Sequence, residues 1–181
     1  MSECRPIPDV TLKTRVRDDS IEGPNPFRWQ DYAVRQEWAG RKIVVFALPG
    51  AFTPTCSNEQ CPGFEQHYDA LRALGVDEVY CIAVNDAFVM YQWSRHLGIS
   101  KVKMLPDGSG QFTRRMGMLI DKSHLGFGLR SWRYAMVVDD LRVTHWFEEP
   151  GINDSGADDD PYGVSTPHNV LQALQSETAL V

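Results

Sequence analysis

The sequence lacks several features that would point to particular classes of protein. It has 181 residues but only four cysteines, Cys4, Cys56, Cys61 and Cys81, and it contains no CxxC pair. The N-terminus has no apolar segment of the kind found in secretory signals. A chain of this size without such a signal does not need a disulfide framework. We therefore expect its thiols to be reduced and the protein to be cytoplasmic. The five histidines are scattered, so no zinc or other metal site is expected.

Long hydrophobic runs and an excess of positive charge are absent too. No apolar stretch reaches the length of about 18 residues that a membrane-spanning helix needs, so no membrane partner is expected. The formal net charge of -6 argues against a nucleic-acid partner, because nucleic acids attract basic surfaces. The length suits one domain with a full core, and we expect residues 1–181 to form a single domain.

The sequence does contain an alternation of strand and helix patterns. Short apolar runs predict strands at Lys42–Leu48, Glu78–Val84, Val102–Leu105, Tyr134–Val138 and Val143–Phe147. Apolar residues at helical spacing, with capping residues, predict helices at Ser57–Leu74, Asp86–Leu97, Gln111–Met116 and Thr166–Gln175. Strands that alternate with helices before a late hairpin indicate an α/β fold, with a mixed central sheet flanked by helices.

One acidic segment, GINDSGADDDP at residues 151–161, follows neither pattern. Its carboxylates lack the closing glutamate of a calcium-binding loop. We expect a solvated surface loop there.

The most informative stretch is PGAFTPTC, Pro49 to Cys56, which follows the first expected strand. Cys56 falls where loop becomes helix, and the unpaired N–H groups there favour a thiolate and lower the pKa of the thiol. Thr53 lies three residues earlier, close enough to turn its hydroxyl toward the sulfur. The alternative, a small apolar cysteine that fills a gap in the core, stays open on local placement alone.

Four strings in order along the chain carry a family resemblance: PGAFTPTC, VNDAFVMYQW, PDGSGQFTRRMGM and LGFGLRSWRYAMVV. The pattern Pro49-x-x-x-Thr53-x-x-Cys56 matches the active-site signature of peroxiredoxins, thiol peroxidases with a thioredoxin-like fold. The strings look like the type II (peroxiredoxin-5-like) branch, and the last two are most similar to the peroxiredoxin half of bacterial peroxiredoxin–glutaredoxin hybrids. The resemblance spans residues 8–174 and implies a thioredoxin-like fold and a homodimer.

The resemblance also implies roles for individual residues. Cys56 would be the peroxidatic cysteine, which attacks the terminal oxygen of hydrogen peroxide or an alkyl hydroperoxide. Thr53 would hydrogen-bond the thiolate and the peroxide, Pro49 would shield the pocket from water, and Arg133 would be the active-site arginine. Arg130 is expected to be a surface or structural residue.

Ionisation of the thiol alone does not account for fast peroxide reduction. A free cysteine is already a few per cent thiolate at neutral pH, so full ionisation gains at most about 30-fold, or roughly 2 kcal/mol. The rest must come from positioning and from donors aimed at the charge that develops on the oxygens.

The oxidised cysteine, a sulfenic acid, has to be reduced. The C-terminal resolving cysteine of type II peroxiredoxins is missing, since GVSTPHNV offers only Ser165 and no cysteine follows Cys81. This predicts a one-cysteine cycle in which glutathione and glutaredoxin are the reducing partners. No bound cofactor is expected.

Two other cysteines leave alternatives open. Cys61 follows Cys56 at the C-x4-C spacing of the bacterioferritin-comigratory branch, so a Cys56–Cys61 disulfide reduced by thioredoxin is the second hypothesis. The helix would have to unwind first, because five residues put the two side chains apart. Cys81 resembles the second cysteine of type II proteins, which is usually buried, and Cys4 is expected to be a bystander.

Two other functions compete with the peroxidase. A thiol–disulfide oxidoreductase on the same fold would normally have CxxC, whereas this loop has TxxC. A redox sensor or holdase, in which oxidised Cys56 alters a partner surface, stays open as a non-enzymatic role.

Overall fold

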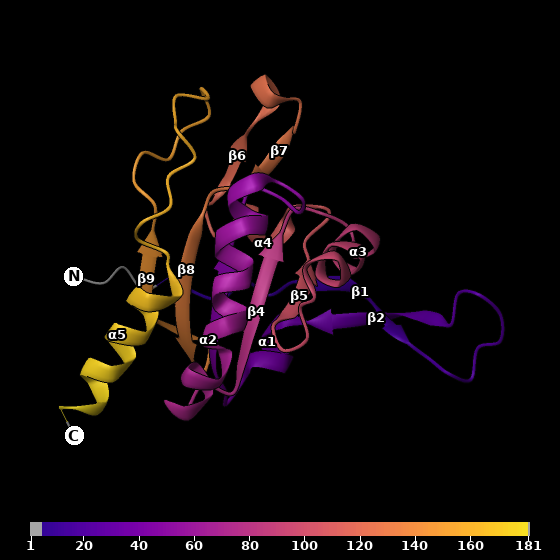
Figure 1. Ribbon diagram of the computed structural model, residues 1–181, viewed down its shortest axis with the longest axis horizontal. Helices are drawn as coiled ribbons and strands as arrows, with labels where there is room; N and C mark the ends of the chain where they lie inside the picture. Colours follow the sequence, from indigo (N-terminus) through magenta and orange to yellow (C-terminus); the bar gives the residue numbers. More distant parts are fainter. Residues whose placement is uncertain (1–4, 181) are drawn as a thin grey trace.

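The computed structural model describes residues 5–180 and is built on one mixed sheet of five strands. Its order is β5-β4-β3-β8-β9 (Figure 1). The parallel part consists of β3 (Lys42–Ala47), β4 (Glu78–Ala83) and β5 (Lys103–Pro106). The antiparallel part consists of β8 (Tyr134–Asp139) and β9 (Arg142–Glu148). The predicted mixed sheet of an α/β fold is confirmed.

Helices cover both faces of this sheet because its central strands are apolar on both sides. In β3, Val44 and Phe46 face one core, whereas Ile43 and Val45 face the other. The first core is closed by α2 (Cys61–Ala73), α3 (Ala87–Leu97) and α5 (Pro167–Thr178). The second is closed by α1 (Val34–Trp38), α4 (Gln111–Arg115) and the N-terminal segment.

Capping residues fix where two of the helices begin and end. The Asp86 side chain accepts a hydrogen bond from the Val89 N–H at 2.9 Å, and α3 ends at Gly98 with φ 69°. The Thr166 hydroxyl accepts from the Asn169 N–H at 3.2 Å at the start of α5. These ends agree with the helices predicted from the sequence.

Two small hairpins were not expected. One pairs β1 (Thr11–Arg17) with β2 (Phe27–Ala33) and projects from the body of the molecule (Figure 1). The other pairs β6 (Leu119–Asp121) with β7 (Leu129–Ser131), around the short 3₁₀ turn η2 (Ser123–Leu125). Their strands are largely exposed or only three residues long, so they carry no buried apolar run that sequence reasoning could detect.

The helix expected at Ser57–Leu74 has an unusual beginning. A π-helical stretch, η1 (Cys56–Gln60), precedes α2, and the Cys61 N–H donates to the Cys56 carbonyl. Chain direction in the parallel strands places this start at the carboxyl end of β3, at the top of Figure 1. Within residues 5–180, every helix is too short or too polar to span a bilayer.

Candidate active site

The loop between β3 and η1 holds Cys56 in place through contacts with neighbouring elements. The Ala51 N–H donates to the Asn85 side chain at 3.0 Å, which ties the loop to the end of β4. The Trp93 indole on α3 donates to the Ser57 hydroxyl at 3.0 Å, directly beside Cys56. The Cys56 side chain is fully buried.

One cation lies against the Cys56 sulfur. Arg133, between β7 and β8, places Nη1 3.5 Å from the Cys56 sulfur and 2.5 Å from the Gln60 side-chain oxygen. The Arg133 side chain is only 2 % exposed. Burial alone would lower the pKa of Arg133, but Cys56 and Asp160 beside it raise that pKa above its usual value. The guanidinium is therefore held charged in a buried position.

The orientation of Gln60 follows from its second contact. Its side-chain nitrogen donates to the Ala47 carbonyl at the end of β3, so its oxygen faces Arg133. Gln60 is completely buried, four residues after Cys56 in the π-helical stretch. Sequence reasoning did not identify it, because no local pattern indicates that a glutamine there will face an arginine 73 residues away.

Thr53 and Pro49 lie in the same loop, and the hydroxyl of Thr53 makes a different contact from the one expected. The Thr53 hydroxyl donates to the Gly50 carbonyl at 2.8 Å, so its proton is directed at the loop rather than at the Cys56 sulfur. The Pro49 carbonyl accepts from Arg130 Nη1 at 3.4 Å. Arg130 is therefore a second arginine at the loop. Burial lowers its pKa and the nearby Cys56 raises it, with a net lowering.

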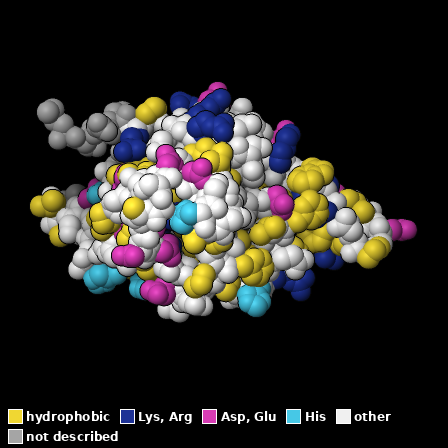
Figure 2. Space-filling model, turned by 90° about the horizontal axis from the view of Figure 1, so that it is seen from above, with side chains coloured by type: hydrophobic (Ala, Val, Ile, Leu, Met, Phe, Trp, Pro, Cys, Tyr) yellow, Lys and Arg dark blue, Asp and Glu magenta, His cyan; other side chains and the backbone are white. Residues whose placement is uncertain are grey.

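A cavity of about 400 Å³ opens beside this loop. Its walls include Pro49, Thr53, Phe127 and the carboxylate-bearing residues Asp158 to Asp160. Figure 2 views the molecule from this end and shows acidic side chains and histidines gathered on one part of the face. A small polar molecule that enters this cavity reaches the loop that ends at Cys56.

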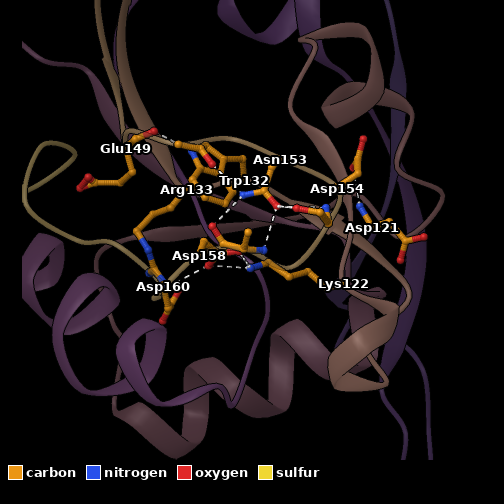
Figure 3. A network of polar contacts seen from close by, with 12 residues as sticks. Asp121, Lys122, Trp132, Arg133, Glu149, Asn153, Asp154, Asp158 and Asp160 are labelled. Atoms are coloured by element: carbon orange, nitrogen blue, oxygen red, sulfur yellow. Dashed lines mark hydrogen bonds and ion pairs between the residues drawn. The ribbon is translucent and has the colours of Figure 1, made fainter.

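The acidic segment 151–161 is an irregular and mostly exposed surface loop, as predicted, but two of its carboxylates pair with cations. Asp158 forms an ion pair with Lys122 at 2.8 Å, and their side chains are only 6 % and 4 % exposed. Asp160 forms an ion pair with Arg133 itself. Figure 3 shows these residues converging on one network. The two ion pairs were not predicted, because the cations that Asp158 and Asp160 contact lie far away in the sequence.

The other cysteines are buried in the same core as Cys56. Cys61, at the first position of α2, and Cys81, in β4, both have no exposed surface. Burial raises the pKa of Cys81 well above its usual value, and the neighbouring Cys61 thiol adds to the shift. Cys4 lies outside the described residues.

Comparisons with known proteins agree with this arrangement. The Redoxin family model matches residues 6–160. A peroxiredoxin from Rhizobium etli is 53% identical over 176 residues, which cover 97% of this chain and 98% of that protein. The hybrid peroxiredoxin hyPrx5 of Haemophilus influenzae is 38% identical, covering 95% of this chain and 66% of the hybrid.

A solved structure shares the architecture as well. The antioxidant protein of Plasmodium falciparum, described as a 1-Cys peroxiredoxin, superposes with a TM-score of 0.84 at 36% identity, covering 94% of this chain and 98% of the other. With the buried Cys56–Arg133 contact at the end of β3, these matches lead to one family. The chain belongs to the Redoxin family, as a peroxiredoxin of the type II (peroxiredoxin-5-like) branch with the thioredoxin-like fold.

Proposed function

We propose that Cys56 is the peroxidatic cysteine of this peroxiredoxin and that glutathione and glutaredoxin recycle it. The observation that carries the proposal is the Arg133 guanidinium 3.5 Å from the Cys56 sulfur, both buried beside a cavity that includes Pro49 and Thr53. Arg133 thus places a fixed positive charge and a hydrogen-bond donor beside the sulfur that would attack the peroxide.

In the reaction, the Cys56 thiolate attacks the terminal oxygen of hydrogen peroxide or an alkyl hydroperoxide. The O–O bond breaks, and the leaving oxygen takes a proton and departs as water or an alcohol, while Cys56 becomes a sulfenic acid. Arg133 presents fixed donors to the charge that develops on the oxygens. Thr53 donates its proton to Gly50, which leaves its oxygen lone pairs free to accept the peroxide O–H. Pro49 forms part of the cavity wall and keeps water from the sulfur.

Glutathione then condenses with the sulfenic acid and releases water, and glutaredoxin or a second glutathione attacks the mixed disulfide to free Cys56. The chain has no cysteine after Cys81, and Ser165 is completely buried where a C-terminal resolving cysteine would be expected. The likeness to a 1-Cys peroxiredoxin and to a hybrid peroxiredoxin supports this cycle. Glutathione and glutaredoxin fit a cytoplasmic setting.

A Cys56–Cys61 disulfide reduced by thioredoxin is the alternative. It is favoured by the π-helical stretch η1, which lies between the two cysteines and closes with the bond from the Cys61 N–H to the Cys56 carbonyl. Unwinding this one stretch would bring the two sulfurs within reach without disturbing the rest of α2.

Turnover with defined reductants separates the two cycles. Peroxide consumption would be followed with glutathione plus glutaredoxin, and separately with thioredoxin and its reductase, for wild type and Cys61→Ser. The one-cysteine cycle predicts turnover with glutathione and glutaredoxin that Cys61→Ser leaves unchanged. Turnover with thioredoxin alone, abolished in Cys61→Ser, would contradict it. A pure sensor or holdase would show oxidation of Cys56 but no turnover with either system.

We also propose that the protein acts as a homodimer. Phe52, in the active-site loop, is 53% exposed and has a left-handed backbone with φ 66°. Its ring lies 5.7 Å from the ring of His96 on α3. A large apolar side chain held out of the surface beside the active site suits a contact with a second copy.

A further inference from the structure

The guanidinium of Arg133 needs more than one contact to hold its plane toward Cys56. Nη1 is shared between the Cys56 sulfur and Gln60, and Nε is buried without a hydrogen-bond partner among residues 5–180. The remaining nitrogen, Nη2, donates to the Asp160 carboxylate. A planar fork with one end on Gln60 and the other on Asp160 has a single orientation.

Asp160 is itself held in an unusual conformation. Its φ of 52° lies in the left-handed region, which non-glycine residues adopt uncommonly and aspartate and asparagine more often than the rest. Its N–H donates to the Asp158 carboxylate at 2.9 Å, and Asp158 also takes two contacts from Lys122 Nζ at 2.8 and 3.0 Å. Lys122 Nζ lies 5.5 Å from the centre of the Trp132 ring, next to Arg133. Figure 3 shows this chain from Lys122 to Arg133.

The segment after Asp160 is anchored as well. The buried Glu149 carboxylate accepts backbone hydrogen bonds from Gly163, Val164 and Ser165. The Glu149 N–H donates to the Arg133 carbonyl at 3.2 Å, so this anchor starts from the backbone of the arginine itself. Asp160 therefore lies between two anchored parts of the chain, the Lys122–Asp158 ion pair before it and the Glu149 contacts after it. Its carboxylate is held at Arg133.

We propose that Asp160 is a positioning residue for peroxide reduction, which orients the Arg133 guanidinium toward Cys56 and the incoming peroxide. The inference rests on the proposed roles of Cys56 and Arg133. Asp160 also partly neutralises Arg133, so it weakens the attraction between Arg133 and the thiolate while it improves the geometry. Removing the carboxylate should therefore lower the rate at which peroxide oxidises Cys56, while the rate at which an alkylating reagent modifies Cys56 stays the same or rises.

Asp160→Asn is the test variant, because asparagine tolerates the left-handed backbone and only the charge is removed. Asp139→Asn is the control for the loss of one carboxylate: Asp139 is exposed at the end of β8, does not line the cavity, and its side chain makes no hydrogen bond or ion pair with any of residues 5–180. Two rates would be measured for reduced protein without reductant. One is single-turnover oxidation of Cys56 by hydrogen peroxide, and the other is alkylation of Cys56 by iodoacetamide as a function of pH.

Iodoacetamide needs the thiolate but not a guanidinium aligned on a peroxide. We expect Asp160→Asn to lower the peroxide rate constant about tenfold or more. Alkylation at neutral pH should stay at or above the wild-type rate, with its midpoint moved to lower pH, because the thiolate then feels the full charge of Arg133. Asp139→Asn should match wild type in both rates. Unfolding temperatures within a few degrees of wild type would show that both variants fold.

Two results would overturn the inference alone. One is an Asp160→Asn protein whose peroxide and alkylation rates fall together, which indicates a general loss of structure at the site. The other is an Asp160→Asn protein whose two rates match those of Asp139→Asn. A wild-type protein that peroxide does not oxidise at Cys56 would overturn the proposed function, and this inference with it.

Discussion

At the level of single residues, the site depends on a pairing between one buried sulfur and one buried cation. Cys56 and Arg133 are 77 residues apart in the sequence, yet their side chains meet at 3.5 Å. Lysine could supply the same charge, but not a planar fork that contacts Cys56, Gln60 and Asp160 together. The geometry of the guanidinium, and not its charge alone, should therefore matter for the rate.

Arg133→Lys tests that statement. We expect the rate constant for oxidation of Cys56 by hydrogen peroxide to fall about 100-fold, the typical cost of losing a donor that stabilises developing charge. Stopped-flow single-turnover kinetics would measure it. Arg130→Lys is the control, because Arg130 contacts the Pro49 carbonyl and not the Cys56 sulfur. An Arg133→Lys protein with wild-type kinetics would show that the fork is irrelevant.

At the level of elements, the acidic segment 151–161 is part of the folded structure around the site. The Lys122–Asp158 pair is almost completely buried, so its two charges depend on each other. Removing one partner leaves a buried charge without compensation, which is far more costly than losing a surface ion pair.

Lys122→Met should therefore lower the free energy of unfolding by about 3–5 kcal/mol. The double variant Lys122→Met/Asp158→Asn should recover most of this loss, because the unpaired charge is gone. Chemical denaturation of the three proteins would measure both effects. A loss below about 1 kcal/mol in the single variant would mean that the pair behaves like an exposed one.

The same pair predicts a dependence of stability on pH. Burial alone would raise the pKa of Asp158, but the hydrogen bond from Lys122 and the Asp160 N–H lower it below its usual 3.8. A lowered carboxylate pKa stabilises the fold in full above the usual value, and the stabilisation is lost as pH falls through the lower, folded-state value. The difference in unfolding temperature between wild type and Asp158→Asn should be constant at neutral pH and shrink below about pH 4. A difference that grows on acidification would contradict this.

The elements also show how far sequence reasoning extends. The central strands β3 and β4 and the helix α3 were predictable, because each is marked by a continuous apolar run or by a cap such as Asp86 and Gly98. The π-helical start at Cys56 was not predictable. Pro54 and Pro62 indicate that a helix begins there, but they do not indicate that its first turn is π-helical. In the site, Cys56, Thr53, Pro49 and Arg133 came from family strings. Asp160 and Gln60 could not be predicted from the sequence, because their shared partner Arg133 lies far along the chain, in the connection between β7 and β8.

At the level of the whole molecule, the active-site loop is also an exposed surface. Phe52 projects from it, and Phe88 on the neighbouring α3 is 50% exposed. A second copy packed over Phe52 would cover its ring and hold the loop that carries Cys56. Assembly and activity would then be linked through the same residues.

Phe52→Asp should convert the proposed dimer to a monomer, because a charge in an apolar contact opposes association. Light scattering coupled to size exclusion would give the mass of each variant. Ile21→Asp is the control, since Ile21 is an exposed apolar residue in the distant β1–β2 hairpin. A wild-type protein that is already monomeric at all concentrations would contradict the proposed assembly.

Under the proposed one-cysteine cycle, Cys56 alone reacts with peroxide, and its sulfenic acid persists until an external thiol reduces it. Intact mass after one equivalent of hydrogen peroxide, without reductant, tests this most directly in wild type and Cys56→Ser. We expect a gain of one oxygen atom in wild type and no change in Cys56→Ser. A loss of two hydrogens would reveal an internal disulfide and contradict the one-cysteine cycle, and no rapid change in wild type would contradict the peroxidase role of Cys56 itself.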